Sequence, residues 1–508
     1  DTAIVAASSL TQTTTTEEEV TNLVKQYVAK AGYDEDMINV TPDIHAVQGT
    51  SISRSVEANV NFRVDTMFMN MMGVDYLPGH ANGGAREGHQ VIEIALVLDI
   101  SGSMGNNGKL QNLKDAAKDF VTTVLTNNSP ERTTISIVPY NQQVYMSADL
   151  MSRLLLKDTQ VTVNGATGGE IATYQTRNPD APCARFHPED FGTRRLASAN
   201  TVDVSASFVD DYFYWALNGL TNIQYEQPHE FSFWCGSHHP TVMLYQNDET
   251  TLHNYIDSFA AYGATAIDYG MNWGVGILDP SFEPIIQSMV DDGLAPAAAA
   301  GHPVQFGTPD VLKYVVVMTD GQNTDHFDLK DEYKAGPSRI WYSETLANGT
   351  EDNGFLVEMP DNGPAQRWYI PNSPDGSWDD EYIHMNALPA DAVQWDYHEL
   401  YRRFRTNDVA NYFFRFSDTA AYEAHLDVVE DVGGYATADT NLQTICSKAT
   451  ENDVIEVFAV AFEAPTNGQT QLQDCVSKPG NYFDVAGTQI SAAFNSIAAQ
   501  ISTLRLTE

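Results

Sequence analysis

The sequence predicts an α/β protein built around a doubly wound, mainly parallel sheet. Four nearly unbroken apolar segments have the length of buried strands, and they occupy residues 91–99, 135–140, 314–321 and 455–462. Strands of a parallel sheet are covered on both faces, so their sequences are apolar throughout instead of alternating. Amphipathic helical patterns lie between these segments, and strands that alternate with helices form parallel sheets with helices on both faces.

The first 90 residues are predicted to form a separate layer of one helix and strands. Apolar side chains recur at helical spacing ahead of a stop signal at Gly32, and they are Val20, Leu23, Val24, Tyr27 and Val28. Two alternating segments, residues 37–47 and 55–68, predict a strand pair. We therefore expect an N-terminal domain over residues 1–90.

Residues 91–508 are predicted to form the main domain. The strand at 91–99 leads through a turn into a helix whose apolar face consists of Leu110, Leu113, Ala117, Phe120, Val121 and Val124. Two long segments interrupt the pattern, at about 150–250 and 326–440, and both are rich in Pro, Gly, Asn, Asp and aromatic residues. Structureless loops of that length are rare in compact domains. We expect two folded insertions with short strands at best.

The charge balance limits the partners of this chain. Of its 508 residues, 27 are Lys or Arg and 68 are Asp or Glu, which gives a formal net charge of −41. Such a chain repels phosphate backbones, so nucleic acid is not expected as a partner. Acidity suits cation binding or a salty medium, and charge alone does not choose between them.

No run of about 20 apolar residues occurs, so no segment of this sequence is expected to span a bilayer. The chain begins at Asp1 without an initiating Met. We expect a mature or truncated product, with membrane attachment only through a segment upstream of Asp1.

Four cysteines indicate two disulfides and an exported protein. Cys183, Cys235, Cys446 and Cys475 show no CxxC spacing, which disfavours zinc ribbons and thioredoxin chemistry. Four cysteines allow three connectivities. We favour Cys183–Cys235 and Cys446–Cys475, because the members of each pair lie within one segment.

The residues with the clearest chemistry follow the apolar strand at 91–99. Asp99, Ser101 and Ser103 lie in the turn between that strand and a helix, at the edge where open α/β sheets bind ligands. Thr265 lies in a Gly-bracketed loop before a helix, and Asp320 follows another buried strand. Hard cations such as Mg²⁺ or Ca²⁺ prefer oxygen ligands of these kinds. The five residues are therefore predicted to bind one divalent cation, with water or a partner's carboxylate completing its coordination.

These motifs resemble a known family. The DISGS turn, the Gly-Ala-Thr loop and the TDG after a hydrophobic strand are similar to the metal-ion-dependent adhesion site (MIDAS) of von Willebrand factor type A domains, whose fold is Rossmann-like. The resemblance implies that Ser101, Ser103 and Thr265 ligate the metal directly. It implies that Asp99 and Asp320 act through water. The alternative interpretation is a Ser-Gly helix cap with incidental neighbours.

Further segments resemble TadG-like proteins of the bacterial tight-adherence (Tad) pilus machinery. They are the opening DTAIVAASSL, TMFMNMMGVD at 66–75, MNWGVGIL at 271–278 and CVSKPGNYF at 475–483. The resemblance covers roughly half of the chain and leaves out both insertions. It implies a pilin-like N-terminal layer and a location in the periplasm, on the cell surface or in an extracellular pilus. The implied partners are a protein ligand or pilus subunits, with surface glycans as a further option.

Three functional hypotheses remain. The first is a metal-dependent adhesion or assembly protein, which holds an acidic group of its ligand through the cation. The second is a structural minor pilin or tip subunit, whose metal site only stabilises the fold. The third is a hydrolase housed in the insertions. Ser103 is not in a GxSxG motif, and neither HExxH nor a phosphate-binding loop occurs, so no enzyme is expected.

Two other groups of residues have simpler structural explanations. His238 and His239 follow Cys235, but no second cysteine is near, so surface histidines beside a disulfide are favoured over a soft-metal site. The aromatic clusters at 210–215 and 366–371 suit a ligand groove, yet the cores of the insertions need large side chains as well.

Overall fold

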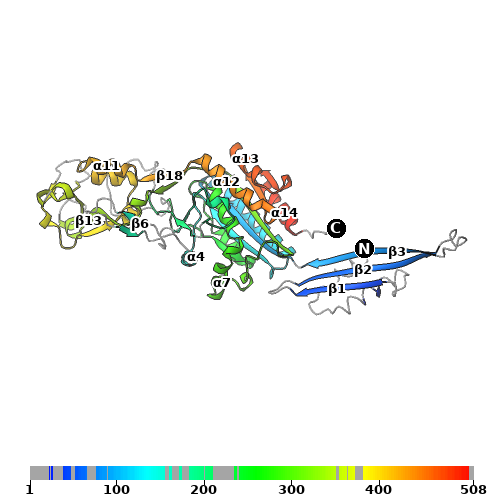
Figure 1. Cartoon of the computed structure of the whole chain (residues 1–508). Coiled ribbons are helices and arrows are strands. Elements are labelled where there is room, and N and C mark those ends of the chain that lie inside the picture. The colour runs from blue at the N-terminus through cyan, green and yellow to red at the C-terminus, as the bar shows by residue number, and fades with distance from the viewer. Residues whose placement is uncertain are drawn as a thin grey trace.

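The structure is a computed structural model of the whole chain (Figure 1). It describes residues 90–154, 182–198, 201–209, 234–236, 239–349, 354–362, 364–371 and 381–502, together with the backbone of 22, 25–26, 38–46, 52–65, 76–88, 160–162 and 171–173. A three-stranded sheet near the N-terminus, an α/β domain and a lobe formed by the second insertion follow one another along the molecule (Figure 1).

The centre of the main domain is a six-stranded sheet with the strand order β10-β5-β4-β11-β19-β20. The strands are β4 (Val91–Asp99), β5 (Thr133–Tyr140), β10 (Met243–Gln246), β11 (Val311–Thr319), β19 (Glu456–Phe462) and β20 (Tyr482–Val485). Neighbouring strands are parallel except for β10, which pairs antiparallel with β5 at one edge. The four apolar segments of the sequence form the four interior strands, so this prediction is confirmed.

Helices cover both faces of the central sheet. One face carries α3 (Lys109–Asn127), α5 (Glu249–Asp257) and α14 (Gln489–Ser502), and the other carries α6 (Ile267–Gly276), α12 (Tyr435–Thr450) and α13 (Thr466–Cys475). Successive side chains of a strand point to opposite faces. Accordingly, Leu96 and Leu98 of β4 join the cluster with α3, whereas Ala95 and Val97 join the cluster with α6.

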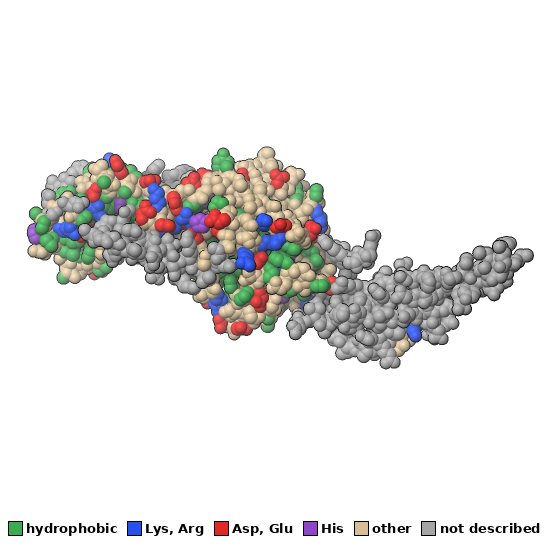
Figure 2. Space-filling model, in the orientation of Figure 1, with side chains coloured by type: hydrophobic (Ala, Val, Ile, Leu, Met, Phe, Trp, Pro, Cys, Tyr) green, Lys and Arg blue, Asp and Glu red, His purple; other side chains and the backbone are tan. Residues whose placement is uncertain are grey.

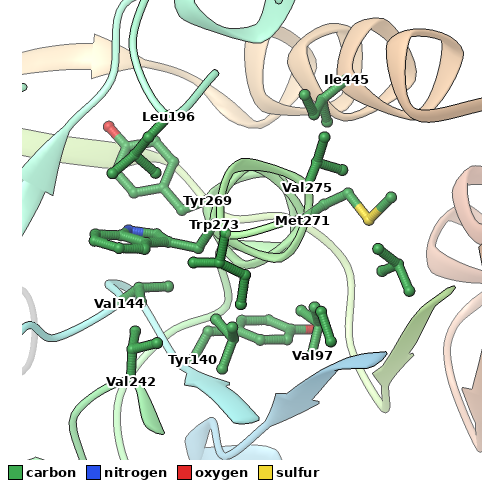
Figure 3. Packing of buried hydrophobic residues seen from close by; sticks show 14 of the residues in the cluster. Val97, Tyr140, Val144, Leu196, Val242, Tyr269, Met271, Trp273, Val275 and Ile445 are labelled. Carbon is green, nitrogen blue, oxygen red and sulfur yellow. The ribbon is translucent and has the colours of Figure 1, made fainter. Parts of the chain in front are cut away.

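Helix α6 is buried along its whole length. Figure 3 shows its side chain Trp273 in the cluster that also contains Val97 and Tyr140 of the sheet and Ile445 of α12. Gly270 allows the close approach of helix and sheet, because a Cβ at this position would lie 2.7 Å from Cδ1 of Tyr140. This packing fixes the start of α6, and with it the loop that carries Thr265, at the carboxyl edge of the sheet.

Both insertions are shorter than the sequence predicts. β10 and α5 lie within the predicted first insertion at about 150–250, but they belong to the central sheet and its helical cover. α12 begins at Tyr435, within the predicted second insertion at 326–440, and packs on α6. The sequence signals are weak because β10 has only four residues and the first turns of α12 are small and polar.

The second insertion is a folded lobe with its own aromatic core. Its antiparallel sheet has the order β16-β15-β14-β13-β17, and its elements are β13 (Pro337–Tyr342), α8 (Glu344–Gly349), β14 (Phe355–Glu358), β15 (Trp368–Ile370), β16 (Glu381–Ile383), β17 (Val393–Asp396), α9 (Tyr397–Arg403), α10 (Thr406–Val409) and α11 (Thr419–Leu426). The antiparallel pair of β12 (His326–Leu329) and β18 (Val429–Gly433) connects the lobe to the main domain.

The first insertion contains shorter elements in the part that the structure describes. They are α4 (Ala148–Arg153), β6 (Gln160–Thr162), β7 (Ile171–Thr173), β8 (Ala184–Arg185) and β9 (Asp203–Val204). β6 pairs with β7 and β8 pairs with β9, in both cases antiparallel. Beyond this insertion, α7 (Glu283–Asp291) lies between α6 and β11 in the chain.

The N-terminal part contains an antiparallel sheet of β1 (Ile38–Ala46), β2 (Ile52–Asp65) and β3 (Tyr76–Gly88). β1 and β2 form the strand pair that the sequence predicts. β3 was not predicted, because its sequence YLPGHANGGAREG is rich in Gly and contains Pro, which are depleted in strands. The helix predicted over 20–28 lies mostly outside the described residues. The division at residue 90 stays a prediction.

Two disulfides join Cys183 to Cys235 and Cys446 to Cys475. The second links α12 to α13, which lie on the same face of the sheet. Among the helices that the structure describes, none combines the length and the apolar character needed to cross a bilayer.

Candidate metal centre

Asp99 ends the central strand β4 and is fully buried. One carboxylate oxygen, Oδ1, accepts a hydrogen bond from the backbone N–H of Ser101 at 2.7 Å. The other, Oδ2, accepts one from the hydroxyl of Thr319 at 2.6 Å. Thr319 is the last residue of the neighbouring strand β11. These two bonds fix the Asp99 side chain at the strand ends and shape the turn that follows it.

The hydroxyls of Ser101 and Ser103 point toward one another in this turn. Their Oγ atoms lie 3.1 Å apart, and Ser103 Oγ donates to Oδ1 of Asp320 at 2.5 Å. A short 3₁₀ helix over Gly102–Gly105 produces this arrangement. Two segments that are more than 200 residues apart in the sequence therefore bring their oxygen atoms to one place.

The loop of Thr265 is held against the same turn by backbone hydrogen bonds. Gly102 N donates to Gly263 O, and Tyr262 N donates to Ile100 O, both at 2.9 Å. Gly263 has a φ of +84°, and a Cβ there would lie 1.7 Å from Oε1 of Gln142, so any other residue would be strained and would displace the Gln142 side chain.

Thr265 lies beside the segment that carries Asp320. A Cβ added to Gly321, the residue after Asp320, would lie 3.2 Å from Thr265 Oγ1. The backbone of Thr265 is also tied to Thr324, whose N–H donates to Thr265 O at 2.9 Å. Nearby, Ile267 N donates to Oδ1 of Asn323 at 2.8 Å. All five predicted residues thus lie at the carboxyl edge of β4 and β11.

Lys109 is a component of the site that sequence reasoning missed. It is the first residue of α3 and only 9% exposed. Its Nζ donates to Oδ2 of Asp320 at 3.0 Å and lies 3.8 Å from Oε2 of Glu463. The signal in the sequence was a lysine six residues after Ser103, which is too common to stand out. The ammonium group neutralises part of the negative charge of the site.

The electrostatics of the site depend on two neighbouring carboxylates. Burial, and then the charge of Asp320, raise the pKa of Asp99 to about 6, although hydrogen bonds from Thr319 and Ser101 oppose the shift. Burial and the same two carboxylates raise the pKa of Tyr140 well above its usual value. A cation bound here would favour the ionised form of Asp99.

The visible surface also carries Asp and Glu side chains in several places, including where the lobe meets the main domain (Figure 2).

The chemistry of these residues fits a hard divalent cation. Neighbouring ligands of octahedral Mg²⁺, with bonds of about 2.1 Å, lie about 3 Å apart, which is close to the 3.1 Å between the hydroxyls of Ser101 and Ser103. Within the described residues, no group of three or more His, Cys, Asp or Glu is arranged to hold a metal. The site consists instead of hydroxyls and two carboxylates, which suits magnesium or calcium better than softer metals.

A buried pair of titratable side chains lies behind the metal centre. Asp268, in the first turn of α6, is hydrogen-bonded through Oδ1 to Nε2 of His326 at 3.0 Å. His326 opens β12 and stacks on Tyr269 with ring centroids 4.5 Å apart. This contact connects the first turn of α6 to the strand that leads into the second insertion.

The other residue groups have structural roles where they are described. His239 is buried and stacks on Tyr145 at 4.3 Å, beside the Cys183–Cys235 disulfide, so it is not the surface residue that we expected. Its neighbour His238 lies outside the described residues, as does the aromatic cluster at 210–215. In the cluster at 366–371, the strand β15 is buried in the lobe.

Comparisons with known proteins found resemblance only among solved structures, since no protein-family model and no curated protein matches the sequence. The vWF domain of the type V pili tip protein Mfa5 from Porphyromonas gingivalis aligns with 11% identity and a TM-score of 0.32, over 82% of this chain and 99% of that one. The pilus adhesin RrgA from Streptococcus pneumoniae aligns with 10% identity and a TM-score of 0.32, over 91% of this chain and 49% of that one. The adhesive tip pilin GBS104 from Group B Streptococcus agalactiae aligns with 11% identity and a TM-score of 0.31, over 81% of this chain and 99% of that one. The strand order and register of the central sheet define the fold of this chain.

Proposed function

We propose that this chain is a metal-dependent adhesion or assembly protein of a Tad-type pilus, which binds an acidic group of its ligand through Mg²⁺ or Ca²⁺. The observation that carries the proposal is the convergence of oxygen atoms from three distant loops. Ser103 Oγ lies 3.1 Å from Ser101 Oγ and 2.5 Å from Asp320 Oδ1. Thr265 lies against Gly321 in the same place.

Each residue has a distinct role in this proposal. Ser101, Ser103 and Thr265 would hold the cation directly, while Asp99 and Asp320 would act through water. A bound divalent cation supplies an open coordination position that a carboxylate of the ligand can fill. The protein's own contribution is positioning, because Asp99 is held by two hydrogen bonds before any metal arrives.

The assignment to a pilus depends on the sequence segments that resemble TadG-like proteins. In one of these segments, at 271–278, residues 271–276 lie in the buried helix α6. Another, residues 475–483, begins at the cysteine that links α13 to α12. We propose binding instead of catalysis, because the proposed role needs only a cation and a complementary surface.

The experiment replaces Asp99 by Ala in the full chain and measures both metal binding and attachment. We expect Mg²⁺ binding, measured by calorimetry, to be lost, while the main domain still unfolds cooperatively in urea. A bacterial strain that carries the variant should lose surface attachment or pilus assembly, and a chelator should cause the same defect in the wild type. Asp291→Ala, an exposed carboxylate of α7, serves as the matched control.

The structural minor pilin or tip subunit remains the second candidate, and one observation favours it. The ammonium group of Lys109 already pairs with Asp320 at 3.0 Å, so the site has an internal cation. If Asp99→Ala removes metal binding while attachment and assembly continue normally, the metal centre only stabilises the fold, and this second candidate is correct.

A further inference from the structure

A cavity opens directly beside the candidate metal centre. It has a volume of about 180 Å³, and its lining includes Trp234, Gln322, Thr324, Asp325, Phe327 and Tyr435. Ala264, the residue before Thr265, is also part of the lining. Thr324 donates its backbone N–H to Thr265 O at 2.9 Å. A ligand held at the metal centre therefore lies next to this cavity.

Three aromatic side chains from distant segments form its apolar walls. Trp234 belongs to the first insertion and meets Phe327 of β12 edge to face, with ring centroids 5.2 Å apart. The next residue, Cys235, is disulfide-bonded, which restrains this wall. Tyr435 opens α12, is 57% exposed and donates its backbone N–H to Oδ1 of Asp325 at 2.7 Å. The insertions thus build a pocket that the central fold alone would lack.

One acidic side chain, Asp325, lines the cavity, together with the exposed amide side chain of Gln322. Asn323 and Thr324 use their side-chain polar atoms on partners inside the protein. Asp431 lies outside the lining, but its carboxylate and that of Asp325 are both near Gly434, since a Cβ there would be 3.9 Å from the first and 3.5 Å from the second. No Lys or Arg is among the described residues that line the cavity.

We infer that this cavity binds a basic side chain, Lys or Arg, of a protein partner whose carboxylate is held at the metal centre. The inference rests on the proposed function, since the metal anchors the acidic group of the same ligand. Aromatic faces attract ammonium and guanidinium groups, and a carboxylate at the rim forms strong charge-assisted hydrogen bonds with them. A glycan would need many hydrogen-bond donors and acceptors in the walls, but the amide of Asn323 and the hydroxyl of Thr324 are already engaged. Gln322 and the hydroxyl of Tyr435 are the neutral polar side chains that then line the described part of the cavity.

The test uses fluorescein-labelled Gly-Ser peptides that contain one Asp and, one to four residues away, a Lys, Arg, Gln or Leu. Fluorescence polarisation measures their binding to the full chain in Mg²⁺. At the best spacing we expect the Lys or Arg peptide to bind about tenfold more tightly than the Gln peptide. Asp325→Asn and Tyr435→Ala should reduce this ratio to near one and leave the affinity for the Gln peptide unchanged.

Matched controls are Asp291→Asn and Phe416→Ala, an exposed carboxylate and a 43% exposed aromatic residue elsewhere on the surface, and both should keep the preference. Equal affinities for Lys and Gln peptides, or a preference that survives in Asp325→Asn and Tyr435→Ala, would overturn the inference.

An acidic oligosaccharide that binds more tightly than every peptide and depends on the same two residues would assign the cavity to a glycan instead. Peptide binding that continues in EDTA contradicts the proposed function itself, whereas Mg²⁺-dependent binding without a basic preference contradicts only the cavity inference.

Discussion

Lowering the pH from 7 to 5 should weaken Mg²⁺ binding about tenfold, because the site must lose a proton before it binds the cation. Burial and the charge of Asp320 raise the pKa of Asp99 to about 6. In the metal-free protein, about nine-tenths of Asp99 is then ionised at pH 7 and about one-tenth at pH 5. The dissociation constant for Mg²⁺ should rise in the same proportion.

Isothermal titration calorimetry at pH 7, 6 and 5 measures this change. Asp99→Asn is the control, since its neutral side chain has a similar shape and does not titrate. Any residual Mg²⁺ binding by Asp99→Asn should therefore show little of the pH dependence. The reasoning is refuted if the dissociation constant of the wild type is the same at pH 7 and pH 5, or if Asp99→Asn shows the same slope.

The raised pKa also predicts how Asp99 affects folding in the metal-free protein. The folded-state pKa of Asp99 lies above the usual 3.8. The protonated side chain therefore contributes fully to stability below pH 3.8, and this contribution is lost as the pH rises through about 6. At pH 7 the ionised carboxylate then costs on the order of 3 kcal/mol. In EDTA, Asp99→Asn should therefore raise the free energy of unfolding by up to roughly this amount at pH 7 and by little at pH 4, as urea titration can show.

Three further predictions concern charge and covalent links. Lys109→Met should tighten Mg²⁺ binding about tenfold or more in calorimetry, because a unit positive charge a few ångströms from the cation opposes binding; weaker binding would show that Lys109 supports the metal instead. Glu93→Gln should lower the free energy of unfolding by about 3 to 5 kcal/mol, because it leaves Lys313 buried without its charge partner. Adding Lys313→Met should restore part of this loss. If the double variant is no more stable than Glu93→Gln, the explanation is contradicted. Replacing Cys446 and Cys475 together by Ser should lower the free energy of unfolding by roughly 3 to 4 kcal/mol, since their disulfide closes a loop with a sequence separation of 29. An unchanged urea midpoint would contradict this expectation.

The local motifs of the sequence predict the four interior strands of the central sheet, and they place Asp99, Ser101 and Asp320 just where two of these strands end. β4 and β11 are apolar along nearly their full length, and each ends in a short polar turn. A parallel sheet brings the carboxyl ends of such strands to one edge. The position of Asp99, Ser101 and Asp320 at one place follows from this geometry.

Residues that act through long-range contacts could not be predicted in this way. Thr319 looks like an ordinary strand residue, and only the register of β11 beside β4 places its hydroxyl on Asp99. Lys109 reaches Asp320 across 211 positions of the sequence. The cavity beside the metal centre combines Trp234, Phe327 and Tyr435, and no local pattern connects these three residues.

Diffraction from crystals of the full chain grown with Mn²⁺ tests the central claim most directly, because Mn²⁺ accepts the same oxygen ligands as Mg²⁺ and its anomalous signal locates the ion. The account predicts an anomalous peak within coordination distance of the hydroxyls of Ser101, Ser103 and Thr265, and the loss of that peak in Asp99→Ala. A peak found only elsewhere, for example between Asp325 and Asp431, or no peak at saturating Mn²⁺, would contradict it.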